Sequence, residues 1–83
     1  MTEPPPYYVT ATFKDGLMVT LDARTWTEAL SIKNRQRKLT DVVQVKIEDM
    51  RTGMDRVYTR RGPTWTREIV KRCIDGENPP IEQ

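Results

Sequence analysis

The sequence of 83 residues contains no histidine and only one cysteine, Cys73. Histidine is the commonest general base in enzymes and the commonest zinc ligand, so its absence argues against both roles. A lone cysteine excludes an internal disulfide bond and is typical of a protein from a reducing cytoplasm. Because unpaired cysteine is among the most buried residue types, we expect Cys73 to pack as a small apolar side chain.

The chain also lacks a glycine-rich phosphate loop, a long apolar run and a signal-peptide pattern. Glu48 and Asp49 are adjacent on an expected strand and therefore point to opposite faces, which disfavours a shared metal ion. The chain is long enough for one modest core, with little room for an enclosed cavity. We therefore expect no metal, no cofactor, no membrane span and no catalytic site.

Charge is present but unevenly placed along the chain. Residues 24–72 hold thirteen Lys and Arg against six Asp and Glu, a formal charge of +7. Residues 1–23 carry −2 and residues 73–83 carry −3, so a basic middle is framed by acidic ends. Such a local field attracts anionic partners although the net charge of the whole chain is only +2.

The stretch FKDGLMV, residues 13–19, predicts the turn of a β-hairpin. A two-residue loop would mix polar and apolar side chains on each face of the hairpin. A three-residue loop, 14–16, places Phe13 opposite Leu17 and makes one face fully apolar. Gly16 then supplies the left-handed residue that such loops need.

A helix is predicted by TWTEALSIKNRQRKL, residues 25–39. Thr25 is the expected N-cap, and Glu28 follows it at the spacing of a capping box. An apolar stripe with one lysine recurs at helical spacing: Trp26, Ala29, Leu30 and Lys33. Basic residues gather near the C-terminal end, where they complement the helix dipole: Lys33, Arg35, Arg37 and Lys38.

The second half of the chain predicts two more strands and a second helix. VVQVKIED, residues 42–49, alternates with Val43, Val45 and Ile47 on the inward side. A turn at Gly53 leads to a strand at 54–60, which Gly62 and Pro63 end. The spacing of Trp65, Ile69 and Cys73 then predicts a helix at 65–75, with Thr64 as its cap.

These elements predict an α+β protein with a four-stranded antiparallel sheet, in the order ββαββα, and both helices packed on one face. The first two strands are expected at 7–13 and 17–23. We expect residues 1–6 to form a flexible lead-in, residues 7–75 a single domain and residues 76–83 a loose acidic tail. An exposed edge strand can pair with a second copy of the chain, so the sequence does not decide between a monomer and a homodimer.

The strand at 54–60 carries the residues most typical of binding. Arg56, Tyr58 and Arg60 alternate and so share one strand face, and we expect Gln44 and Lys46 to lie across from them. Such a face suits phosphate contact and base stacking, and it suits a protein interface equally well. The third interpretation is that these residues form an ordinary solvated sheet face with no binding role.

Two stretches resemble small phage-encoded anti-CRISPR proteins of the type I-F class: VTLDARTWTEALSIK, residues 19–33, and VVQVKIEDMRTGMDRVY, residues 42–58, with a later Trp65. Proteins of that family pair a hairpin, a short helix after a Ser or Thr, and a second hairpin. The resemblance covers residues 19–65, and the expected C-terminal helix and acidic tail depart from it. It implies a non-enzymatic inhibitor that binds a bacterial type I CRISPR surveillance complex and blocks target DNA.

Carried onto this chain, the resemblance implies contacts from basic and polar residues of the helix and sheet. The expected partner-binding set, completed by Arg60 of the same strand face, is Lys33, Arg35, Lys46, Arg56, Tyr58 and Arg60. The partner would be the CRISPR effector complex with its RNA, in the cytoplasm of a bacterial host. The alternative is a small non-specific nucleic-acid-binding protein, and direct contact with nucleic acid is open in both cases.

Overall fold

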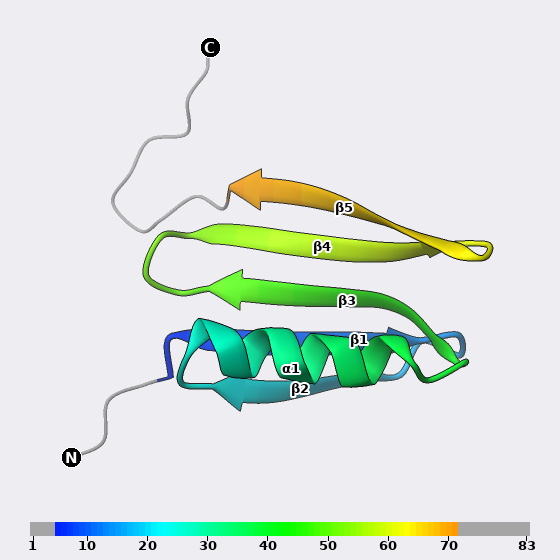
Figure 1. The fold of residues 1–83 in the computed structure, drawn as a ribbon, viewed down its shortest axis with the longest axis horizontal. Coiled ribbons are helices and arrows are strands. Elements are labelled where there is room, and N and C mark those ends of the chain that lie inside the picture. Colours follow the sequence, from blue (N-terminus) through cyan, green and yellow to red (C-terminus); the bar gives the residue numbers. More distant parts are fainter. Residues whose placement is uncertain (1–4, 72–83) are drawn as a thin grey trace, which may run out of the picture.

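One antiparallel sheet and a helix packed on one of its sides make up the described part of the chain, residues 5–71 of this computed structural model (Figure 1). The sheet order is β2-β1-β3-β4-β5. The elements are β1 (Tyr7–Phe13), β2 (Met18–Ala23), α1 (Trp26–Arg37), β3 (Val42–Asp49), β4 (Met54–Arg61) and β5 (Thr64–Lys71). The α+β class is confirmed, but the order is ββαβββ with five strands.

The first hairpin has the three-residue loop that the hydrophobic pattern predicts. Val9 pairs with Leu21 and Ala11 pairs with Val19. The Phe13 amide donates to the Leu17 carbonyl at 2.8 Å, which closes the loop. Gly16 has a φ of 93°, a backbone conformation that side chains with a Cβ rarely adopt. The register therefore follows from the alternation of apolar residues together with this glycine.

Helix α1 begins where the cap predicts. The Glu28 amide donates to the Thr25 hydroxyl at 3.1 Å, so Thr25 is the N-cap. The Glu28 carboxylate accepts from the Arg24 amide at 2.7 Å, one residue earlier than the reciprocal bond of a standard capping box. The bond to Thr25 satisfies an amide that the first turn leaves without a partner, and the bond from Arg24 ties the preceding residue to the helix.

The core lies between α1 and the strands β1 and β3. Within the described residues its buried side chains are Tyr7, Val9, Ala11, Ala23, Ala29, Ile32, Val42, Val45, Ile47 and Tyr58. A register shift at the end of β1 pairs Phe13 with Val42. Val42, at the shifted position, is therefore fully buried, whereas Val43 is half-buried.

The predicted second helix is wrong, because Thr64–Lys71 is strand β5. Gly62 has a φ of 62°, and proline fixes the next φ near −65°, a pair that fits the type II′ turn of a two-residue hairpin. Gly62 and Pro63 therefore reverse the chain instead of ending the structure. Residues 72–75 of that expected helix, including Cys73, lie outside the described residues. So do residues 1–4 of the lead-in and the tail 76–83.

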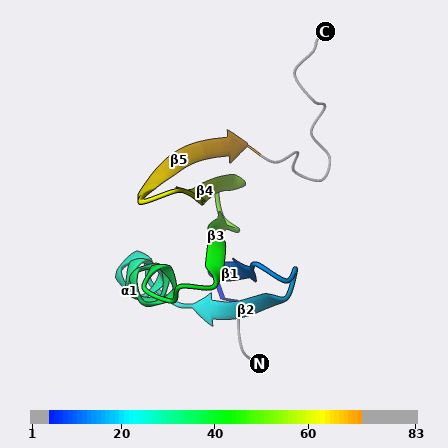
Figure 2. The same cartoon turned by 90° about the vertical axis from the view of Figure 1, so that its right-hand side faces the viewer.

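The helix covers only part of its side of the sheet. It packs on β1, β2 and β3, whereas β4 and β5 extend beyond it (Figure 2). This offset leaves the helix side of β4 and β5 reachable from solvent, next to the flank of α1. None of the helices among residues 5–71 is long and apolar enough to cross a membrane.

Candidate anion-binding surface

The helix side of β4 and β5 carries a row of cationic and aromatic side chains. Tyr58 pairs with Arg67, and Arg60 pairs with Trp65, so these four share one side of the sheet. Arg56 lies two residues before Tyr58 and therefore on the same side. The shared side of Arg56, Tyr58 and Arg60 agrees with the sequence prediction, but that side also holds the helix.

Helix α1 contributes the other half of this surface. The Lys33 ammonium lies 4.6 Å from the centroid of the Tyr58 ring. The Arg37 guanidinium lies 5.2 Å from the Trp65 ring, on which Arg60 also stacks at 4.7 Å. These contacts link side chains of α1 to strands that the helix backbone does not touch.

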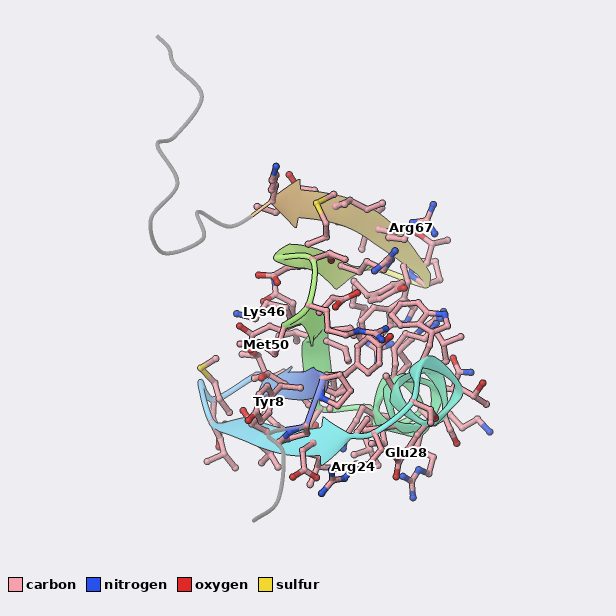
Figure 3. All side chains as sticks on the ribbon, turned by 90° about the vertical axis from the view of Figure 1, so that its left-hand side faces the viewer. Tyr8, Arg24, Glu28, Lys46, Met50 and Arg67 are labelled. Atoms are coloured by element: carbon pink, nitrogen blue, oxygen red, sulfur yellow. The ribbon has the colours of Figure 1, made fainter. Side chains whose placement is uncertain are left out.

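A third contact completes the row at the start of the helix. The Arg56 guanidinium lies 4.5 Å from the ring centroid of Trp26, so β4 reaches the first turn of α1. We call the whole set the cation–aromatic surface: Lys33, Arg37, Arg56, Arg60 and Arg67, with Trp26, Tyr58 and Trp65. Figure 3 shows side chains filling the space between α1 and β4–β5, with Arg67 at its upper end.

The surface gathers charges of one sign. The acidic residues of β4 and β5 in the described range, Asp55 and Glu68, lie on the opposite face, because Asp55 pairs with Glu48 and Glu68 with Val57. These pairings put Arg56, Arg60 and Arg67 on the helix side, and both acids, together with Arg61, on the other side. The resulting field favours an anionic ligand.

The pKa of Lys33 is affected by the other positive charges of this surface. Its side chain is only 9% exposed, wedged between α1 and Tyr58. Burial lowers the pKa of Lys33 below its usual range, and the nearby charges of Arg37 and Arg67 lower that pKa further. An anion bound here would offset the repulsion among these three cations.

Arg60 has a structural task in addition to its charge. Its guanidinium donates to the carbonyls of Val42 at 2.9 Å, Leu39 at 3.1 Å and Arg37 at 3.3 Å. These bonds fix the segment between α1 and β3 against β4. They also satisfy carbonyls near the C-terminal end of the helix, where positive charge is favourable. Arg60 is therefore less available to a partner than the sequence analysis predicts.

An open hollow lies at one end of the surface. Its volume is about 390 Å³, and it is lined by Asn34, Arg37, Lys38 and Trp65. Arg37 is held over the Trp65 ring by stacking, whereas Arg60 on the same ring is tied to three carbonyls. Of the two cations on this ring, Arg37 is thus the one that borders the hollow.

Two predicted site residues lie elsewhere. Lys46 pairs with Val57 and Thr10, on the face away from the helix, so its predicted place across from Arg56 is wrong. Figure 3 shows Lys46 and Arg67 on opposite sides of the sheet. Arg35 is exposed and lies roughly 200° around the helix from Lys33, since each residue turns the helix by about 100°.

The face opposite the helix is rich in hydroxyl and amide groups. The hydroxyls of Thr10 and Thr20 are 2.9 Å apart, and the Gln44 amide nitrogen donates to the Thr59 hydroxyl at 3.4 Å. Gln44 therefore shares this face with Lys46, not with Arg56 as predicted. The polar threonines and the arginine row lie on different faces and do not form one site.

Sequence reasoning missed four members of the surface. Trp26, predicted as a member of the apolar helix stripe, packs against the core and also stacks on Arg56. Trp65 and Arg67 were assigned to a helix, and Arg37 was read only as a partner of the helix dipole. The signal is the share of β-branched and aromatic residues in TWTREIVK, residues 64–71, which favours a strand, and a strand places Trp65 and Arg67 on one face.

No protein-family model, no curated protein and no solved structure matches this chain. Among residues 5–71, no three Cys, Asp or Glu side chains gather in a group suited to a metal ion.

Proposed function

We propose that this protein is a non-enzymatic binding protein that holds nucleic acid on the cation–aromatic surface. One observation carries the proposal: five cations and three aromatic rings lie together, and the acids of β4 and β5 in the described range are on the other face. Cations neutralise phosphates, and ring faces stack on bases. Both groups are needed to hold a flexible nucleic acid strand.

The geometry favours a single strand over a duplex. Helix α1 packs along the sheet and is not free to enter a groove of double-stranded DNA. Trp65 borders an open hollow beside Arg37 and Lys38, so an unpaired base has a ring to stack on and a cation for its phosphate. Contacts of this kind read backbone and stacking and carry little sequence preference.

Binding of a fluorescent single-stranded DNA or RNA oligonucleotide, measured by anisotropy, tests this function. Five cations that each neutralise one phosphate give a log–log salt slope of at most about −3.5 on a single strand. The double substitution R37E/R67E reverses two charges of the surface and should weaken binding roughly tenfold or more at low salt. The matched control, R35E/K46E, reverses two charges outside the surface and should weaken binding much less.

Equal losses in the two double variants would show that only net charge matters and would overturn the assignment of the surface. Circular dichroism of each variant separates lost binding from lost folding. An absence of binding by the wild-type protein to every oligonucleotide at low salt would remove nucleic acid as the direct ligand.

The resemblance of residues 19–65 to type I-F anti-CRISPR proteins supports a second candidate, an inhibitor of a bacterial type I CRISPR complex. The grooves of such a complex that receive DNA must be basic, so a cationic surface is repelled there. In this candidate the cation–aromatic surface would contact the guide RNA or the incoming strand of the complex. In this candidate the partner is a nucleoprotein complex, and the protein binds that complex through its nucleic acid.

A purified type I CRISPR complex tests the second candidate. An inhibitor would abolish the gel shift of target DNA at about one to a few copies per complex, and R37E/R67E would not. Nucleic-acid binding without the complex, combined with no effect on the gel shift, would leave the first candidate alone. A gel shift unchanged by the wild-type protein overturns the second candidate.

A further inference from the structure

Strand β2 and the residue before it, Leu17, expose apolar side chains at one edge of the sheet. Leu17, Met18, Val19 and Leu21 are 57%, 59%, 36% and 40% exposed, half of the large apolar side chains that are exposed in residues 5–71. Figure 1 shows β2 as the outer strand on the side of the sheet away from β5. A long apolar edge without a partner is a template for another strand.

The backbone of β2 is also ready for pairing. The Phe13 amide bonds to the Leu17 carbonyl, and hydrogen-bonded positions alternate along an antiparallel pair. Residues 17, 19, 21 and 23 therefore direct their amides and carbonyls to β1. Met18, Thr20 and Asp22 direct theirs outward, where the described sheet has no further strand.

The charge pattern around β2 favours a second copy of this chain as the occupant. Residues 14–24 hold two bases and two acids, and residues 17–21 hold no charge, so two copies meet there without net repulsion. The opposite edge differs, because β5 carries Arg67, Glu68 and Lys71 and adjoins the cation–aromatic surface. Pairing two copies through β5 would bring two basic surfaces together.

We propose that β2 pairs antiparallel with β2 of a second copy about a two-fold axis at Thr20. Thr20 then faces its own copy, Met18 faces Asp22 and Val19 faces Leu21. This register pairs all three outward-facing residues of each copy, whereas a shift of two residues leaves an end residue without a partner. A shift of one would set outward amides against inward ones.

The dimer joins Leu17, Val19 and Leu21 of both copies on the helix side, whereas Met18 lies on the other face. It forms a continuous ten-stranded sheet. Arg24 of each copy then lies opposite Gly16, next to Asp15 of the other, so the ends of the interface pair opposite charges. An isologous two-fold contact of this kind closes on itself and does not extend into a filament. It leaves both cation–aromatic surfaces at the outer strands.

Sedimentation velocity of the full chain, from roughly 1 µM to roughly 500 µM, tests the proposal. The wild-type protein should be a dimer at the upper concentrations. Val19→Lys sets a charge in the apolar row, and Met18→Pro removes an outward amide, so each should weaken the dimer at least tenfold, as edge charges and prolines do. Ile69→Lys, the same kind of change on β5, should leave it unchanged.

A monomer at every concentration overturns the proposal, as does a dimer that both β2 variants preserve. Open-ended polymers would indicate β2-to-β5 pairing and overturn the closed dimer. Circular dichroism must show that each variant folds. If Val19→Lys unfolds, Met18→Pro still decides, because it leaves the side of β2 that bonds to β1 intact.

Oxidative crosslinking tests the register in a Cys73→Ser background. Thr20→Cys lies on the axis, where paired Cα atoms are about 5.5 Å apart, within reach of a disulfide. Position 17 is exposed as well, but in the Leu17→Cys variant six residues of offset separate the two cysteines by about 20 Å. Rapid crosslinking of the first variant alone supports the register, and equal rates or faster crosslinking of the second overturn it.

Discussion

Single residues of the cation–aromatic surface combine binding chemistry with structural work. Arg60 stacks on Trp65 and also donates to three backbone carbonyls, whereas Arg56 stacks on Trp26. The strand period predicted that Arg56 and Arg60 share a face. It could not predict the carbonyls, because they belong to the segment between α1 and β3, whose path depends on tertiary packing.

Arg60→Lys should destabilise the fold by about 1–3 kcal/mol, because an ammonium keeps the charge but cannot serve three carbonyls with a planar fork. Urea unfolding measures the free energy. Arg56→Lys is the matched control and should cost within about 1 kcal/mol, as expected for a stacked cation. Equal losses in the two variants would mean that the three carbonyl bonds contribute nothing to stability.

Lys33→Met should show how much the buried, charged ammonium of Lys33 destabilises the fold. The folded-state pKa of Lys33 lies below its unfolded value of 10.5, so its charged form is disfavoured in the fold. The wild-type protein carries this penalty fully at neutral pH and loses it as pH rises through the folded pKa toward 10.5. Lys33→Met should therefore gain stability over wild type at pH 7, less its lost stacking on Tyr58, and this gain should shrink by pH 10.

Unfolding free energies of both proteins at several alkaline pH values give this difference directly. Lys38→Met, at the exposed helix end, is the control for the loss of a lysine that is not buried. A difference that stays constant from pH 7 to 10 would place Lys33 in an environment that does not disfavour its charge.

At the scale of helices and strands, the sequence correctly predicts the elements whose residue pattern fits only one type of secondary structure. The first hairpin, the helix cap and the inward residues Val45 and Ile47 follow from period and turn chemistry. The segment 64–71 satisfies two periods, since Trp65 and Ile69 fit a helix stripe and also one face of a strand. Pairing with β4 decides between them, and that contact is not a local property of the segment.

Gly62→Ala should loosen the β4–β5 hairpin. A Cβ at this position meets no atom within 4 Å, so the cost comes from the positive φ alone, about 1–2 kcal/mol. Because β5 contacts only β4 in the described sheet, amides of β5 should exchange with solvent faster while those of β1 and β3 change less.

Pro63→Ala, which keeps the glycine, is the control for that variant and should cost less. Amide exchange that rises equally in all strands would show that β5 unfolds only together with the whole sheet.

At the scale of the whole molecule, the distribution of charge outweighs its sum. The net charge is +2, yet α1, β4 and β5 gather five cations on one side and direct Asp55 and Glu68 to the other. The sequence predicted a basic middle of the chain. It did not predict which side of the sheet would hold the cations, because that depends on the strand register and on the helix lying beside them.

Salt should stabilise this protein by screening the repulsion within the cation–aromatic surface, so thermal midpoints should rise between roughly 0.05 and 0.5 M NaCl. Arg37→Gln/Arg67→Gln removes two charges of the surface and should flatten this rise. Arg35→Gln/Lys46→Gln removes the same net charge from outside it and should keep most of the rise. Since the two variants have equal net charge, only the placement of the charges can separate their salt responses. Identical slopes would mean that the cations are too far apart, or too well screened, to act as one site.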